Sequence, residues 1–274
     1  MSCKSPDNSK GLYLIKEYYS MIRFIKVVII IMILTVEIFP KSVKPQSKQN
    51  GVYISYQIGH LSLIDELISN QQYCGSLSGW EIKWIAGDSS QITQLGFNYI
   101  LGKRIKNFSV EAEVQNFTLY YDWLLKSDIF RIFSKECTFY SGPSVLIFLH
   151  TRRQDIGNTP LEKSNLGSIS INIYNRIAFR ITPAFCLMSD FRLSLFSFTG
   201  KTVDTVPGEQ EPSNLKVLSG FSAVDLYSIV SFRWFLQKYF SLTFEYFFNL
   251  KQVSVWDYYR SLTDNISLKL GIWF

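Results

Sequence analysis

Histidines limit the catalytic chemistry that this sequence could perform, because its 274 residues include only two, His60 and His150. His150 ends the apolar stretch SVLIFLH, just before the polar stretch TRRQDIGNTP. On a strand its side chain would share a face with that of Arg152, since residues i and i+2 point to the same side. A guanidinium cannot act as a nucleophile. His150 is therefore the one candidate for catalysis.

Sequence motifs that bind metals, phosphates or organic cofactors are absent. The sequence contains no HExxH motif, no EF-hand loop, no paired CxxC motif and no glycine-rich phosphate loop. We therefore expect neither a metal nor a cofactor, and a non-enzymatic role is favoured.

Charged residues of both signs recur at the polar positions of alternating segments. If these segments form a small barrel, the charges face one another in its lumen. They could line a narrow, porin-like channel. We favour a structural brace, because barrels of about eight strands are mostly filled by side chains and buried charges need partners. The expected polar network consists of Glu111, Glu113, Arg176, Asp225, Arg233, Glu245 and Lys269.

The segments that carry these charges alternate with a period of two, which indicates strands with chemically different faces. In the last segment, for example, Ile266 and Leu268 lie on one face and Ser267 and Lys269 on the other. We expect ten strands, over residues 79–86, 91–101, 107–119, 121–133, 138–150, 166–177, 181–199, 220–235, 239–250 and 263–274.

The alternation fits a soluble secreted β-sandwich that acts as a binding module, but other features favour a closed antiparallel transmembrane β-barrel. The apolar faces are bulky, and aromatic residues gather near strand ends, as in interfacial girdles. We expect about ten strands (8–12 possible), with both chain ends in the periplasm and the long loops outside. Tight turns are expected near Gly102–Lys106, Ser134–Glu136, Ala178–Arg180 and Leu236–Lys238, and longer loops over 151–165, 199–215 and 250–263.

The end of the chain, ISLKLGIWF, resembles the β-signal of bacterial outer-membrane β-barrel proteins. This resemblance implies location in the bacterial outer membrane and contact with its lipids and lipopolysaccharide. It also implies insertion by the barrel-assembly machinery and pairing of the last strand with the first. The residues that carry it are Ile266, Leu268, Leu270, Ile272 and Phe274.

The position of His150 at the rim of a barrel resembles that of the histidine in two groups of outer-membrane lipid hydrolases, the lipid A deacylases and the outer-membrane phospholipases. Both have a serine nucleophile two residues after the histidine, where this sequence has Arg152. The outer-membrane protease pattern also fails, since neither His60 nor His150 follows an Asp at i−2. We expect a surface structural, adhesive or ligand-binding protein or a narrow channel, and a His150-dependent lipid hydrolase is the alternative. Arg152, Arg153 and Lys163 could attract lipopolysaccharide phosphates.

The N-terminal part reads as a targeting segment. Residues 21–42 combine a basic start with the apolar run Val27–Val36, which fits a signal peptide. Residues 1–20 are then an upstream extension and 43–50 a polar linker.

Residues 51–78 are harder to place. The stretch 51–60 alternates, but as an eleventh strand it would break the even count of a single-chain barrel. The residues that follow suggest a short helix, because Leu61, Ile64, Leu67 and Ile68 recur at helical spacing after a possible Ser62 cap. We therefore assign 51–78 to an N-terminal segment with a strand and a short helix, and 79–274 to the barrel.

Composition excludes several classes. With 16% aromatic and 18% charged residues, the chain is neither disordered nor a typical soluble domain, in which about a quarter of residues are charged. The net charge of +6 comes mostly from residues 1–50, which contain eight basic and three acidic residues and include the predicted signal peptide. We therefore expect no nucleic-acid partner.

Overall fold

The computed structural model describes residues 50–65, 69–88, 90–107, 110–132, 135–156, 159–206, 209–210, 214–219, 223–254 and 259–274. The predicted extension, the signal peptide and all but the last residue of the linker lie outside these ranges. Within them, no helix is long and apolar enough to span a membrane.

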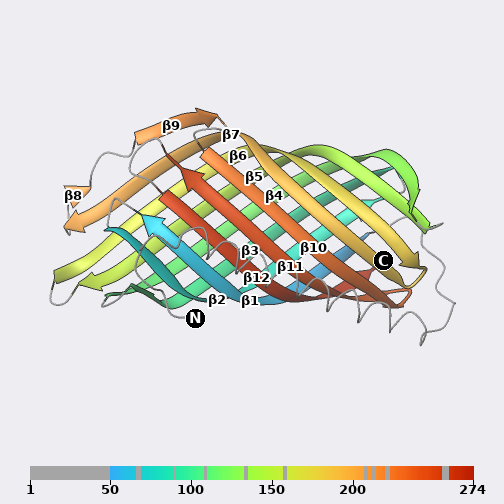
Figure 1. The fold of residues 1–274 in the computed structure, drawn as a ribbon, viewed down its shortest axis with the longest axis horizontal. Helices are drawn as coiled ribbons and strands as arrows, with labels where there is room; N and C mark the ends of the chain where they lie inside the picture. Colours follow the sequence, from blue (N-terminus) through green and yellow to red (C-terminus); the bar gives the residue numbers. More distant parts are fainter. Residues whose placement is uncertain are drawn as a thin grey trace. The chain divides into compact units, whose positions relative to one another are not determined.

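The described chain is a closed antiparallel β-barrel of ten strands. Figure 1 shows these strands winding steeply around the barrel axis. They are β1 (Gly51–Asp65), β2 (Ser69–Gly87), β3 (Gln91–Asn107), β4 (Val110–Ile132), β5 (Lys135–Ile156), β6 (Thr159–Thr182), β7 (Phe185–Val206), β10 (Ala223–Gln237), β11 (Phe240–Val253) and β12 (Tyr259–Trp273).

Two pairings close the barrel. The first strand pairs with the last over its whole length, from Gly51 opposite Trp273 to Asp65 opposite Tyr259. β7 pairs with β10, from Leu193 opposite Leu226 to Phe185 opposite Trp234. The expected closed barrel and the expected pairing of the last strand with the first are confirmed, and the alternative of a β-sandwich is wrong.

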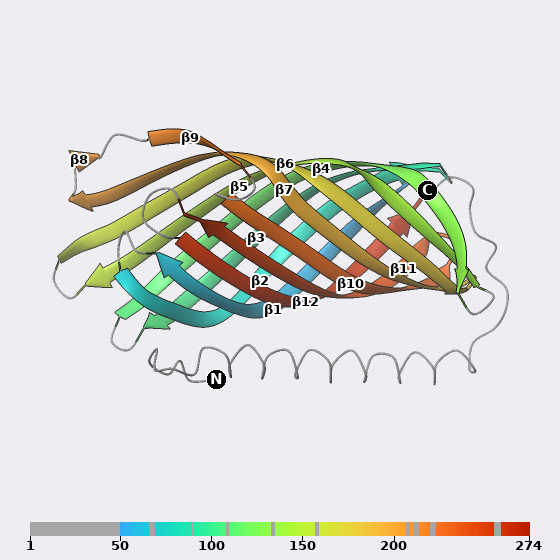
Figure 2. The ribbon, with the colours of Figure 1, turned by 45° about the horizontal axis from the view of Figure 1, so that its top comes forward.

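Two short strands extend the wall at one end. β8 (Glu209–Gln210) and β9 (Asn214–Ser219) both pair with the second half of β7. They therefore occupy the edge of β7 beyond the point where β10 leaves it. Figure 2 shows them at the end of the barrel opposite the C-terminus.

The count of ten strands is right, although two elements were misread. The stretch 51–60 belongs to β1, and the helix predicted after it is wrong, because the described residues there continue β1 and begin β2. The helical spacing misled because apolar side chains point both ways at this end of β1. Leu61 and Leu63 are fully buried in the lumen, whereas Ile64 points outward.

The predicted strands 107–119 and 121–133 are one strand, β4. No turn separates them at Tyr120 and Tyr121. Tyr120 points into the lumen and is 4% exposed, whereas Tyr121 points outward and is 48% exposed. Two adjacent tyrosines thus belong to opposite faces of a continuous strand.

Short connections occur at both ends of the barrel. At the end that carries Gly51 and Trp273, two residues join β4 to β5, β6 to β7 and β10 to β11, and three join β2 to β3. At the opposite end, β1 and β2, β3 and β4, and β5 and β6 are joined by three, two and two residues, and the connections from β7 to β10 and from β11 to β12 are longer.

The long loop predicted over 151–165 is therefore wrong, because β5 continues to Ile156 and β6 begins at Thr159. The turn predicted near Gly102–Lys106 is wrong, because β3 continues to Asn107 through a bulge. Arg104 enters that bulge with a φ of 62°, in the left-handed region.

The outer surface of the barrel carries an apolar belt. Along β12, Ile266, Leu268, Leu270 and Ile272 are each 43–47% exposed, and the alternate residues from Asn265 to Trp273 are buried in the lumen. Large exposed aliphatic and aromatic side chains recur at outward positions of the other barrel strands, including Trp80, Phe97, Tyr121, Ile171 and Phe244. A lipid-facing wall has this pattern.

Toward the end that carries β8 and β9 the polarity of the wall reverses. On β4, Ala112 and Val114 point inward and are buried, whereas Glu111 and Glu113 point outward. The prediction that Glu111 and Glu113 belong to the lumen is therefore wrong. This part of the barrel has a polar exterior, and its interior combines these apolar side chains with buried polar ones such as Arg152 and Gln154.

The expected orientation can be tested with two serines in exposed positions. Ser90 lies in the connection between β2 and β3, and Ser254 lies just after β11 at the opposite end. In outer-membrane barrels the connections between strands are short on the periplasmic side and longer on the outside. On intact cells, a membrane-impermeant maleimide should label Ser254→Cys and should label Ser90→Cys only after the outer membrane is permeabilised. The reverse pattern, after subtraction of the wild-type background, would contradict this orientation.

Candidate functional site in the lumen

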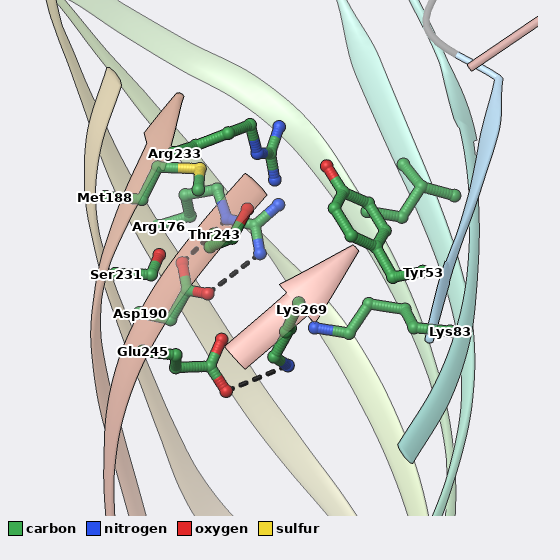
Figure 3. A pocket seen from close by; sticks show the side chains of 11 residues that line it. Tyr53, Lys83, Arg176, Met188, Asp190, Ser231, Arg233, Thr243, Glu245 and Lys269 are labelled. Carbon is green, nitrogen blue, oxygen red and sulfur yellow. Dashed lines mark hydrogen bonds and ion pairs between the residues drawn. The ribbon is translucent and has the colours of Figure 1, made fainter. Parts of the chain in front are cut away.

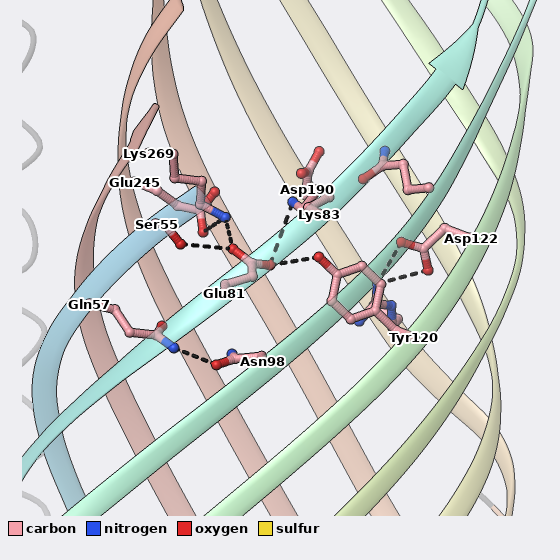
Figure 4. A network of polar contacts seen from close by, with 12 residues as sticks. Ser55, Gln57, Glu81, Lys83, Asn98, Tyr120, Asp122, Asp190, Glu245 and Lys269 are labelled. Atoms are coloured by element: carbon pink, nitrogen blue, oxygen red, sulfur yellow. Dashed lines mark hydrogen bonds and ion pairs between the residues drawn. The ribbon is translucent and has the colours of Figure 1, made fainter. Parts of the chain in front are cut away.

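The centre of the lumen is organised around the carboxylate of Glu81 on β2. Lys269 of β12 donates a hydrogen bond to Glu81, and its Nζ also lies 2.8 Å from the carboxylate of Glu245 on β11. The hydroxyl of Tyr120 donates to Glu81 at 2.6 Å, and Lys83 Nζ lies 3.8 Å away. Figure 4 shows these side chains converging from different sides of the barrel. The group links strands far apart in sequence.

Tyr120 can reach Glu81 because β3 has a glycine between them. A Cβ at Gly96 would lie 2.0 Å from the tip of the Tyr120 ring. The ring therefore crosses the lumen over this glycine, where any other residue would block it.

Two arginine–aspartate pairs bridge the lumen beside this group. The guanidinium of Arg176 donates to both carboxylate oxygens of Asp190, at 2.6 and 2.8 Å. Arg192 donates to Asp122 at 2.8 and 2.9 Å. All four side chains are nearly completely buried. Such pairs are strongly coupled because little water screens them.

Arg192 also lies among three tyrosine rings. Its guanidinium carbon is 5.0 Å from the ring centroid of Tyr120, and 4.8 Å from those of Tyr174 and Tyr227. Cation–π attraction therefore adds to the ion pair with Asp122.

A further pair lies nearer the end that carries β8 and β9. Lys251 Nζ lies 3.0 Å from Asp225 Oδ2 and donates to the Ser168 hydroxyl at 2.8 Å. It also lies 4.3 Å from the ring centroid of Phe148. A salt bridge, a neutral hydrogen bond and an aromatic face thus surround this ammonium group.

The structure places five of the seven residues of the expected polar network in the lumen. Glu111 and Glu113 are the exceptions, and Glu111 instead binds Lys106 at 2.7 Å on the exposed surface, where this hydrogen bond lowers the pKa of the carboxyl. The five that lie buried in the lumen are Arg176, Asp225, Arg233, Glu245 and Lys269.

Sequence reasoning missed several members of the network. On β2 the signal was present, because Glu81 and Lys83 alternate with the bulky outward residues Trp80, Ile82 and Trp84. The same alternation carries Arg192 on β7 and Asp122 on β4, whereas Asp190 has a large outward neighbour, Phe191, on one side only. A charged residue between two large lipid-facing residues is thus the pattern to search for. The missed members are Glu81, Lys83, Asp122, Asp190, Arg192 and Lys251.

Apolar side chains fill the lumen on both sides of the charged layer. Toward the end that carries β8 and β9, a buried cluster includes Leu61, Leu63, Tyr73, Ile105 and Val114, each at most 2% exposed. At the other end, Tyr53, Ile85 and Trp273 form a smaller buried cluster. Side chains therefore fill the lumen through most of its length.

His150 lies inside the lumen and is 1% exposed. Its Nδ1 lies 2.6 Å from Asn116 Oδ1, and its ring packs edge-on against Tyr259 at 5.3 Å. Arg152, which holds the place of the hydrolase serine, lies over the Tyr73 ring at 3.9 Å and donates to Gln154. This arrangement resembles a packed polar core.

The prediction that Arg152, Arg153 and Lys163 attract lipopolysaccharide phosphates is wrong for Arg152. Arg152 is fully buried in the lumen and faces no lipid, whereas Arg153 points outward and is exposed. The side chain of Lys163 lies outside the described part. A role for Arg153 in binding lipid phosphates stays a prediction.

Metal ligands are not grouped in the described chain. Within the ranges given above, no three His, Cys, Asp or Glu side chains lie close enough together to hold a metal ion. The polar groups of the lumen instead bind one another.

A closed antiparallel barrel with an exposed apolar belt and a polar lumen has the architecture of bacterial outer-membrane β-barrel proteins. The chain is similar to the outer membrane protease OmpT from Escherichia coli, with 10% identity, a TM-score of 0.50, and coverage of 85% of this chain and 99% of that one. It is also similar to the translocator domain of the autotransporter NalP from Neisseria meningitidis, with 8% identity, a TM-score of 0.45, and coverage of 84% and 90%.

A third similar structure is the Neisserial surface protein A, with 12% identity, a TM-score of 0.34, and coverage of 81% of this chain and 97% of that one. No protein-family model matches the sequence, and no curated protein matches it. The likeness to OmpT shows the fold. Together with the belt, this fold is that of an outer-membrane β-barrel and agrees with the expected location in the bacterial outer membrane. Recognition of its last strand by the barrel-assembly machinery stays a prediction.

The buried pairs predict a large difference between lumen and surface charge variants. Asp190→Asn leaves the Arg176 guanidinium buried without its carboxylate and should lower the free energy of unfolding by about 3–5 kcal/mol. Glu111→Gln removes a comparable contact at the exposed surface and should leave that free energy nearly unchanged. Urea unfolding of the folded barrel in detergent micelles, followed by tryptophan fluorescence, measures both. Equal effects of the two substitutions would contradict a tightly coupled lumen.

Proposed function

We propose that this protein is a non-conducting outer-membrane barrel with a structural, adhesive or ligand-binding role at the cell surface. The observation that carries the proposal is the filled lumen. The buried cluster around Leu61 and Leu63 lies above the charged layer, and the cluster around Tyr53 and Trp273 lies below it. An ion would have to displace apolar side chains at both ends of its path.

The unequal strand lengths support a role for the barrel as a base for surface structures. β5, β6 and β7 have 22, 24 and 22 residues, whereas β10, β11 and β12 have 15, 14 and 15. A tilted strand crosses a membrane with about 9–11 residues. The longer strands therefore continue beyond the membrane and would present their ends, together with β8 and β9, at the surface.

The polar outer wall agrees with this proposal. Lys103 and Arg104 on the β3 bulge and Glu113 on β4 point outward beyond the apolar belt. Water, lipid headgroups or a partner can surround such residues, whereas hydrocarbon cannot. The rim that these residues share is where we expect ligands or partners to bind.

The lipid hydrolase is less well supported by the geometry. Its histidine would have to act on a lipid, but His150 lies in the lumen on the other side of the wall from the belt. Its ring nitrogen is also bonded to an amide, Asn116, and position 152 carries a guanidinium.

A filled lumen predicts electrically silent bilayers. The purified barrel, inserted into planar lipid bilayers, should give no regular conductance steps, while an open porin in the same bilayers provides the positive control. Flotation of proteoliposomes confirms that the barrel has inserted. Conductance steps that change with Glu245→Gln in the lumen and not with Glu113→Gln on the outer wall would contradict the proposal.

A further inference from the structure

One buried basic side chain of the charged layer, Arg233, forms no ion pair with the described residues. Burying an ion without a counter-charge is costly, so such a side chain calls for another partner. The other cations of this layer lie beside buried carboxylates: Lys83 and Lys269 beside Glu81, Arg176 beside Asp190, Arg192 beside Asp122 and Lys251 beside Asp225. Glu245 also binds Lys269.

Arg233 lines a small pocket on the side of the charged layer toward the barrel end that carries Trp273. Four basic side chains and two carboxylates line it. The carboxylates are already engaged, since Asp190 binds Arg176 and Glu245 binds Lys269. Figure 3 shows Arg233, Lys83 and the hydroxyl of Tyr53 directed toward the same space.

Arg233 lies in the lumen among aromatic rings, and one of its N–H groups is unpartnered in the described chain. It is 8% exposed, and its guanidinium lies near the rings of Tyr53, Trp273 and Phe235, at 5.1, 5.2 and 5.9 Å from their centroids. Its buried Nε has no hydrogen-bond acceptor within the described part of the chain. Aromatic faces stabilise a cation but leave this N–H without a partner.

A second unpartnered group lies beside it. Thr243 on β11 is directly opposite Arg233 on β10 in the antiparallel register. Its buried hydroxyl oxygen likewise has no hydrogen-bond partner among the described residues. Both side chains line the pocket, whose empty space is on the scale of a water molecule.

We propose that this pocket binds one small monatomic anion, with a halide such as chloride as its ligand. Arg233 Nε–H and the Thr243 hydroxyl would donate hydrogen bonds to the anion, and the Lys83 ammonium group would contribute charge. The anion would then offset the charge of Arg233, since Glu81, Glu245 and Asp190 already pair with the lysines and with Arg176. A halide is larger than a water molecule, so the long side chains of Arg233 and Lys83 would have to move slightly apart, whereas a phosphate or a carboxylate would need much more room.

Bromide tests the site directly, because it replaces chloride and can be located by anomalous scattering. In crystals of the detergent-solubilised protein grown with sodium bromide, we expect an anomalous peak within hydrogen-bond reach of Arg233 Nε and Thr243 Oγ1. Density without an anomalous signal there, in crystals where bromide is bound elsewhere, would show that water fills the pocket and would overturn the proposal.

Stability gives a second test that does not need crystals. At equal ionic strength, the wild-type barrel should have a higher Tm in sodium bromide than in sodium gluconate, whose anion is too large for the pocket, and the difference should saturate with concentration. Arg233→Met should abolish this difference, whereas Arg153→Met on the outer wall should keep it. If Arg233→Met does not fold, Thr243→Val serves instead and should weaken the halide dependence. An unchanged dependence in the lumen variants would overturn the proposal.

Discussion

Closure of the wall is the constraint on which the rest of this structure depends. In lipid every backbone N–H and C=O must be paired, and the β1–β12 and β7–β10 pairings leave no open edge along the belt. Ten strands enclose a narrow lumen. The inward side chains therefore have little water around them and must bind one another. For this reason Glu81 forms an ion pair with Lys269, and Asp190 forms one with Arg176.

The same wall meets two different surroundings along its length. Around the belt the exterior is lipid, so outward residues such as Leu268 are apolar and inward residues such as Lys269 are polar. Farther along, the exterior is polar, and the interior holds the apolar cluster around Leu63 and Val114 with Arg152 packed against it. The polar rim thus begins where the surroundings of the outer wall change from lipid to water. Together with the filled lumen, this rim favours a role at the surface over conduction.

Much of the fold can be predicted from period-two alternation, because this pattern is strong where lipid and lumen differ most. Strands β10, β11 and β12 and their turns are read nearly correctly in this way. The pattern fails where the surroundings reverse. On β4 the assumption that apolar residues face lipid led to the wrong prediction that Glu111 and Glu113 lie in the lumen. On β1 the inward Leu61 and Leu63, next to outward apolar residues, gave a spacing that is typical of a helix. The partners of each buried charge could not be predicted, because they lie across the lumen on strands distant in sequence.

Spin-label accessibility measures the reversal of polarity along β4 most directly. Single labels are placed in turn at the outward positions Glu113, Gln115, Phe117, Leu119 and Tyr121 of the barrel in lipid bilayers. We predict that a water-soluble nickel chelate reaches the label at Glu113, whereas at Leu119 and Tyr121 lipid-dissolved oxygen dominates. A label at Glu113 that is immobile and inaccessible to both reagents would place this side chain in the lumen and contradict the account.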